Sequence, residues 1–100
     1  MAVSALTELA ETWAAMGDPR TAAAYCEQAA EVGAQAGLLP SAQAQLLRRA
    51  GSNWVQAGVP SRAALMPLRR AAELLTGAGD IAGAVRARIE EASAWASIAD

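Results

Sequence analysis

The stretch TWAAMGDPRTAA, Thr12–Ala23, determines how this chain is expected to fold. Gly17 follows Trp13 by four residues, and Pro19 follows it by six. A glycine readily adopts the positive φ that ends a helix, and a proline suits the first helical position, where its missing N–H would be unpaired anyway. The stretch therefore predicts one helix ending near Met16, a tight turn, and a second helix beginning at Pro19.

The same pattern recurs along the chain. The interval from Trp13 to Trp54 equals the interval from Trp54 to Trp95, and Gly58 and Pro60 follow Trp54 at the spacings seen in the first copy. A small residue lies three positions before every tryptophan, and the second copy carries one extra residue in the helix after its turn. Self-similarity at a fixed period of about 41 residues indicates stacked structural repeats.

The rest of the chain favours helices. Alanine-rich stretches have apolar residues three and four positions apart, and no stretch alternates as a strand does. We therefore expect an all-α fold of antiparallel helical hairpins. The five expected helices span roughly residues 3–16, 19–36, 40–57, 60–77 and 80–98.

We expect residues 1–100 to form one domain. The first repeat covers about residues 3–39, the second about residues 40–79, and a partial or capping repeat covers residues 80–100. The last helix is expected to cover the exposed face of the fourth helix, as a capping helix does, and its polar residues fit that role: Arg86, Arg88, Glu90 and Glu91.

Pro67 interrupts the pattern, because a proline inside a helix removes a backbone hydrogen bond. Two interpretations stay open. The fourth helix either runs through Pro67 with a kink or bulge near Met66, which would also account for the extra residue, or begins at Pro67 after a separate turn over Ser61–Met66.

Large and small residues occupy matched positions in the copies. The first copy offers Leu6, Leu9, Ala10, Trp13, Gly17, Ala22, Cys26 and Ala29; the second offers Leu47, Ala50, Gly51, Trp54, Gly58, Ala63, Leu68 and Ala71; the third offers Ala92 and Trp95. This pattern resembles the tetratricopeptide repeat (TPR) family. The period is longer than the family's usual value of about 34 residues. The residue pattern is similar to that of the SNAP-like adaptors of membrane fusion, but we do not infer a role in fusion from it.

The resemblance implies a right-handed superhelix and a role as a protein-binding scaffold or adaptor. In this family the first helix of each hairpin lines a concave groove that holds peptides or partner helices. Carried over position by position, the groove residues are Thr7, Glu11, Gln45, Arg48, Ser52, Gln56, Arg86 and Ser93. Arg48 and Arg86 would pair with the carboxylates of an acidic peptide. The alternative is that these residues form an ordinary solvated surface.

Composition argues against several other classes of protein. The chain has no histidine, a single cysteine, Cys26, and a net charge of −2. The usual zinc sites, imidazole catalysis and an internal disulfide are therefore absent. We expect no enzyme activity, no cofactor and no metal, and the acidic balance argues against nucleic-acid binding. Cys26 is expected to be a buried, small apolar residue, and the tryptophans are expected to be core residues.

No apolar run reaches the ~18 residues that span a bilayer, and the N-terminal stretch lacks the features of a signal peptide. We therefore expect a cytoplasmic protein with no membrane span. Residues 1–40 carry a net charge of −4 and residues 41–100 a net charge of +2. This asymmetry favours a homo-oligomer formed through exposed repeat ends, or it reflects pairing on ordinary helix surfaces. A self-assembling structural unit and a sensor segment of a larger regulator stay open as alternative functions.

Overall fold

The computed structural model of the chain describes residues 2–58 and 62–99. They form five helices: α1 (Ala2–Ala15), α2 (Pro19–Gln35), α3 (Pro40–Gln56), α4 (Arg62–Gly77) and α5 (Ile81–Ala99). The part described contains no strand, so the expected all-α fold is confirmed. The helix bounds agree with the expected ones to within one or two residues, although Pro60, the expected start of the fourth helix, lies outside the described residues.

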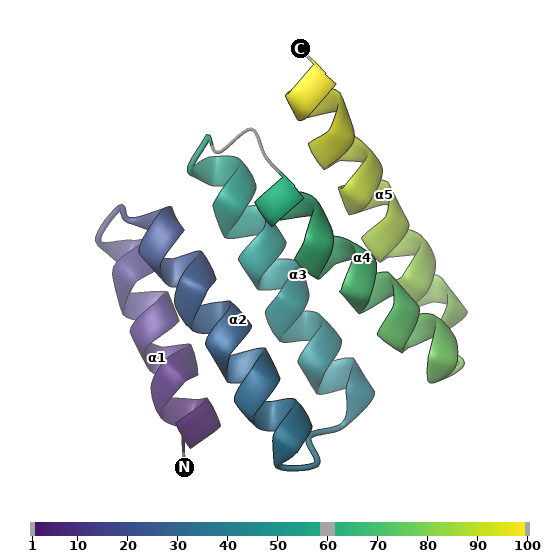
Figure 1. Cartoon of the computed structure of the whole chain (residues 1–100), viewed down its shortest axis with the longest axis horizontal. Coiled ribbons are helices and arrows are strands. Elements are labelled where there is room, and N and C mark those ends of the chain that lie inside the picture. Colours follow the sequence, from purple (N-terminus) through teal and green to yellow (C-terminus); the bar gives the residue numbers. More distant parts are fainter. Residues whose placement is uncertain (1, 59–61, 100) are drawn as a thin grey trace.

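The helices run alternately up and down and stand side by side in the order of the sequence (Figure 1). Each helix packs mainly on its neighbours in the chain. The resulting molecule is a slab of 40 × 34 × 17 Å, so a large share of every helix lies near a surface. The right-handed superhelical path implied by the family resemblance stays a prediction.

The turn between α1 and α2 has the structure that the opening stretch predicts. Gly17 has a φ of +84°, and its counterpart Gly58 has a φ of +70°. Asp18 caps α2, because its Oδ1 accepts the backbone N–H of Thr21 at 3.1 Å and its Oδ2 accepts the Thr21 hydroxyl at 2.8 Å. Pro19 then occupies the first helical position. Local turn chemistry therefore accounts for the end of α1 and the start of α2.

A second pair of glycines ends the other helix of each hairpin. Gly37 follows α2 with a φ of +85°, and Gly79 follows α4 with a φ of +81°. Their separation in the sequence exceeds that of Gly17 and Gly58 by one position. The extra residue of the second copy is therefore accommodated between Gly58 and Gly79.

Helix α4 is continuous through Pro67, so the interpretation in which the helix begins at this proline is wrong. Tertiary packing accounts for the result. Leu65, which precedes the proline, is buried in one cluster with Leu68 and Ala94 of α5. This packing holds the first turn of α4 helical despite the backbone hydrogen bond that Pro67 cannot make. The kink expected near Met66 stays a prediction.

Most of the buried core consists of alanine side chains, which allow the helix backbones to approach closely. Ala22, Ala23 and Ala29 of α2 are fully inaccessible, and Cys26 is buried as expected. The tryptophans behave differently: Trp13 and Trp54 are half-buried, and Trp95 is exposed. The prediction that all three are core residues is therefore wrong for Trp95, because no other described helix covers that side of α5.

Helix α5 packs on α4, and its polar residues divide between contacts with other helices and exposure to solvent. Glu91 is buried, and Glu90 is turned toward α3, where it pairs with Arg48. Large apolar side chains, including Ile81 and Ile89, are also exposed on this helix. Glu90 and Glu91 thus attach α5 to α3 and α4, Arg86 and Arg88 are exposed, and large apolar side chains lie on the outer side.

Candidate functional site

Side chains from α1, α3 and α5 meet on one side of the slab, which we call the odd-helix face. Two ion pairs cross this face. Arg48 of α3 binds Glu90 of α5, and Arg49 of α3 lies 3.6 Å from Glu11 of α1. Successive residues of a helix point about 100° apart, so the two adjacent arginines reach opposite neighbours. Helix α3 is therefore linked to both flanking helices of this face.

The two ion pairs differ in strength. Arg48 donates from Nε to Glu90 Oε1 at 2.7 Å and from Nη2 to Oε2 at 2.9 Å, which is a bidentate arrangement. Bidentate arginine–carboxylate pairs combine charge with fixed geometry and are among the stronger polar contacts. The Arg49–Glu11 contact is longer, and both of its side chains are substantially exposed. Such a pair contributes little to stability, so Arg49 is available to another carboxylate or carbonyl.

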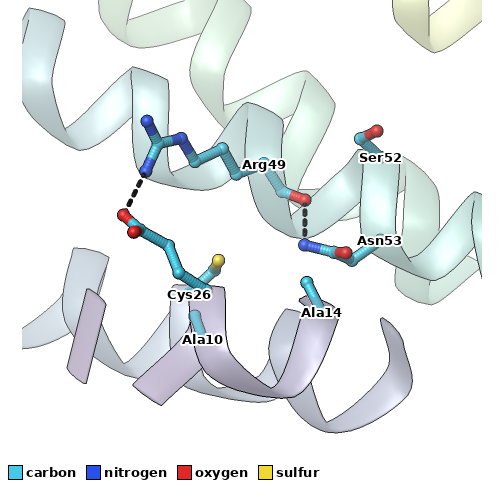
Figure 2. A pocket seen from close by; sticks show the side chains of 7 residues that line it. Ala10, Ala14, Cys26, Arg49, Ser52 and Asn53 are labelled. Atoms are coloured by element: carbon cyan, nitrogen blue, oxygen red, sulfur yellow. Dashed lines mark hydrogen bonds and ion pairs between the residues drawn. The ribbon is translucent and has the colours of Figure 1, made fainter. Parts of the chain in front are cut away.

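A hollow of about 410 Å³ opens beside Arg49, between α1 and α3. Figure 2 shows Arg49, Ser52 and Asn53 of α3 on one side of it, facing Ala10 and Ala14 of α1. Buried Cys26 of α2 also lines this hollow. The short alanine side chains leave the space open, so the polar groups of α3 can be reached from solvent.

The lining of this hollow can both donate and accept hydrogen bonds. Asn53 Nδ2 donates to the backbone carbonyl of Arg49 at 3.0 Å, which orients the amide and leaves its Oδ1 as an acceptor (Figure 2). The guanidinium of Arg49 and the hydroxyl of Ser52 supply donors. Burial raises the pKa of the Cys26 thiol above its ordinary value, which disfavours the thiolate. The arrangement suits binding of a polar chain.

A second hollow of about 280 Å³ lies on the same side, between α3 and α5. Gln45 and Arg48 of α3 and Arg86 of α5 line it, together with Asp80, the residue that caps α5. Arg86 is exposed and forms no ion pair with any other described side chain. This hollow is therefore the more cationic of the two.

The structure distributes the eight groove residues of the sequence analysis over these places. Glu11 and Ser52 line the first hollow, and Gln45, Arg48 and Arg86 line the second. Thr7, Gln56 and Ser93 line neither. The hydroxyl of Thr7 is already bound to the Val3 carbonyl at 2.8 Å. Arg48 is engaged by Glu90, so a partner's carboxylate would have to displace that residue.

Sequence reasoning missed Arg49 and Asn53, the two best-placed polar residues of the first hollow. They lie one position beyond Arg48 and Ser52, which the family pattern selected. Their spacing of four residues, which places them on one side of a helix, is the signal that could have identified them.

The opposite side of the slab carries a different set of polar residues. Trp54 of α3 donates its indole N–H to Glu27 Oε2 of α2 at 3.1 Å. Burial raises the pKa of Glu27, and the hydrogen bond from Trp54 offsets only part of this effect. Glu27, Glu31 and Arg70 line a hollow of about 310 Å³ there. The arginine that lines this hollow lies beside two carboxylates.

Among the described residues, no group of three histidine, cysteine, aspartate or glutamate side chains could hold a metal ion. None of the helices within the described ranges combines the length and apolar character required to cross a membrane. Comparisons with protein-family models, with curated proteins and with solved structures give no match to this chain.

Proposed function

We propose that this chain is a TPR-like interaction module that binds an extended segment of a partner protein across its odd-helix face. The observation that carries the proposal is the hollow between α1 and α3, where exposed polar groups lie beside an open space of about 410 Å³. The resemblance of the long-period repeat to the TPR family supports the same function.

Arg49 is the principal binding residue in this proposal. The side chain of Arg49 is 46% exposed. Its contact with Glu11 is long, at 3.6 Å, so a partner's group can replace it. A carboxylate or backbone carbonyl of the partner accepts hydrogen bonds from the guanidinium. The free Oδ1 of Asn53 accepts a backbone N–H of the same segment. An extended peptide offers both kinds of group at every residue.

The second hollow extends the binding surface toward α5. Arg86 is unpaired among the described side chains and provides a second cation on the same side of the slab. The preferred partner is therefore a segment that carries one or more carboxylates, either as acidic side chains or as a free C-terminus. Arg48 serves mainly to hold α5 against α3 through Glu90.

A selection from a random peptide library displayed on phage tests the function. Peptides enriched on the folded chain are synthesised, and their dissociation constants are measured by isothermal titration calorimetry. Arg49→Ala removes the principal donor and is expected to weaken binding at least about tenfold, which corresponds to ~1.4 kcal/mol. Ser52→Trp fills the hollow and is expected to weaken binding as well.

Arg70→Ala is the matched control, because Arg70 is an arginine on the opposite side of the slab. It is expected to leave the dissociation constant unchanged. The proposal fails if no peptide is enriched, or if enriched peptides bind the Arg49→Ala and Ser52→Trp variants as tightly as they bind the wild-type chain. Circular dichroism confirms that each variant stays helical.

A further inference from the structure

The outer side of α5 carries a row of exposed apolar residues that the proposed function does not use. Ile81, Val85 and Ile89 are spaced four residues apart, and Trp95 lies six residues after Ile89. These spacings place the four residues on one side of the helix. We call them the α5 stripe. Ile89 is 60% exposed and Trp95 is 49% exposed. Ile81, Val85 and Ile89 line an apolar hollow of about 430 Å³. A contiguous apolar surface of this kind marks a site of interaction.

The repeat explains why this surface is apolar. Val85 and Ala92 of α5 correspond to Ala44 and Gly51 of α3, one repeat earlier. In α3 these two positions are buried: Ala44 packs in a cluster with residues of α4, and Gly51 lies directly against Leu68 of α4. The α5 stripe therefore borders the side that a further helix covers in the preceding repeat.

At the other end of the stack, the outer side of α1 is also left uncovered. Ala5 and Leu9 of α1 correspond to Leu46 and Ala50 of α3, which are buried in clusters with residues of α2. No described helix covers this side of α1, so Leu9 is 42% exposed. Ala2, Ala5 and Leu9 lie along this outer side, and exposed Met16 follows in the turn after α1; we call these four residues the α1 stripe. A repeat stack normally ends in polar outer surfaces, whereas both outer helices of this one expose large apolar side chains.

We infer that the occupant of the α5 stripe is the α1 stripe of a second copy of this chain, so that copies assemble head to tail. Helices α1 and α5 run in the same direction (Figure 1), so translated copies bring the two stripes together in parallel. Small residues dominate the first half of the α1 stripe, opposite the large Ile81 and Val85 of the α5 stripe. Small and large side chains interdigitate in such a contact.

Charge favours the same arrangement. Residues 1–40 carry a net charge of −4 and residues 41–100 a net charge of +2. Glu8, the seventh residue of α1, and Arg86, the sixth residue of α5, are both exposed, and neither forms an ion pair with another described side chain. Parallel stacking places them at similar heights beside the two stripes. Opposite charges then flank the apolar contact and disfavour pairing of like ends.

A contact between two different surfaces does not close on itself unless the rotation between copies happens to form a ring. The assembly therefore grows with concentration beyond two copies. Its apolar contact uses the outer sides of α1 and α5, whereas Arg49 and Asn53, the principal residues of the proposed peptide site, lie on the odd-helix face; Arg86 borders both surfaces. Failure of one proposal leaves the other standing.

The mass of the wild-type chain, measured by light scattering and analytical ultracentrifugation from micromolar to millimolar concentration, provides the first test. The expected result is a mass that rises from that of the 10.2 kDa monomer past twice that value. Leu9→Glu blocks the α1 stripe, and Ile89→Glu blocks the α5 stripe. Each variant alone is expected to stay monomeric.

A mixture of the two blocked variants is the decisive sample. The intact α5 stripe of the Leu9→Glu variant meets the intact α1 stripe of the Ile89→Glu variant, so the mixture is expected to form a one-to-one dimer and to stop there. The two blocked surfaces both carry an added glutamate and repel each other. Met66→Glu, at an exposed apolar residue of α4 outside both stripes, is the matched control and is expected to assemble like the wild-type chain.

Three outcomes would overturn the inference. The first is a wild-type chain that stays monomeric at every concentration, which would mean that the stripes accept some other protein or nothing. The second is a wild-type chain that stops at two copies together with a Leu9→Glu variant that still dimerises, which would indicate pairing of α5 with α5. The third is a mixture of blocked variants that stays monomeric although the wild-type chain assembles, which would rule out the α1–α5 contact.

Discussion

Substitution of Gly51 by alanine tests how tightly α3 approaches α4. A Cβ at position 51 would lie 2.5 Å from Leu68 Cγ and 2.6 Å from Leu68 Cδ2. Cγ is the branch point of the leucine rather than its flexible end, and Leu68 is only 2% exposed, so a small movement of the side chain does not relieve the contact. The substitution therefore forces the two helices apart or forces Leu68 out of its rotamer.

Two opposing effects determine the size of the change. Replacing a glycine inside a helix by alanine stabilises the helix by up to about 1 kcal/mol. Overpacking a tight core costs about 1–3 kcal/mol, and contact at the leucine branch point places this site near the upper end. The free energy of unfolding is therefore expected to fall by about 2 kcal/mol, which lowers the melting temperature by roughly 8–16 °C in a domain of this size.

Chemical and thermal denaturation of Gly51→Ala, Leu68→Ala and the double variant measure this effect. In the Leu68→Ala background the new Cβ has room, so the alanine at position 51 is expected to stabilise the chain by about 1 kcal/mol instead of destabilising it. The coupling between the sites is thus about 3 kcal/mol. Gly77→Ala is the matched control, because nothing lies within 4 Å of its added Cβ. A Gly51→Ala variant as stable as Gly77→Ala would show that the close approach of α3 and α4 is absent.

Two further predictions concern polar contacts between helices. Arg48→Ala and Glu90→Ala are each expected to lower the free energy of unfolding by about 1 kcal/mol, because the two residues form a bidentate pair that is only partly exposed. Arg49→Ala is expected to lower it by less than about 0.5 kcal/mol. A double-mutant cycle that shows zero coupling between Arg48 and Glu90 would contradict this prediction. Glu27→Gln is expected to stabilise the chain at pH 7 by less than about 1 kcal/mol. Burial raises the pKa of Glu27, so the ionised form of this residue is disfavoured in the folded chain. The stability of the wild-type chain therefore falls as the pH rises from the ordinary pKa of a glutamate through the raised pKa of Glu27. Denaturation at low pH, where Glu27 is protonated, should show the two proteins equally stable, and a gain that persists there would refute the electrostatic cause.

The helices could be predicted from the sequence because their ends depend on local chemistry. Gly17 supplies the positive φ, Asp18 caps α2 and Pro19 begins it, all within three residues. The recurrence of this pattern around Trp54 then extended the prediction to the rest of the chain. At Pro67 local propensity opposed burial of Leu65, and only the packing against α5 showed which effect prevails.

The candidate site was predicted only in part. The family pattern placed Glu11 and Ser52 at what is now the first hollow, but it selected Arg48 rather than Arg49 as the available cation. Two adjacent arginines look equivalent in a sequence. They became different once α3 lay between α1 and α5, because one of them met Glu90 at close range and the other met Glu11 only at 3.6 Å.

The repeat in the sequence was sufficient to establish that Leu9, Ala50 and Glu91 occupy equivalent positions, since each lies four positions before the tryptophan of its own copy. Only the tertiary structure decided that Ala50 and Glu91 are buried while Leu9 is exposed. The periodicity of a helix determines which residues share one of its sides. Whether that side meets water depends on the neighbouring helix, and the first and last helices of a stack each lack one neighbour.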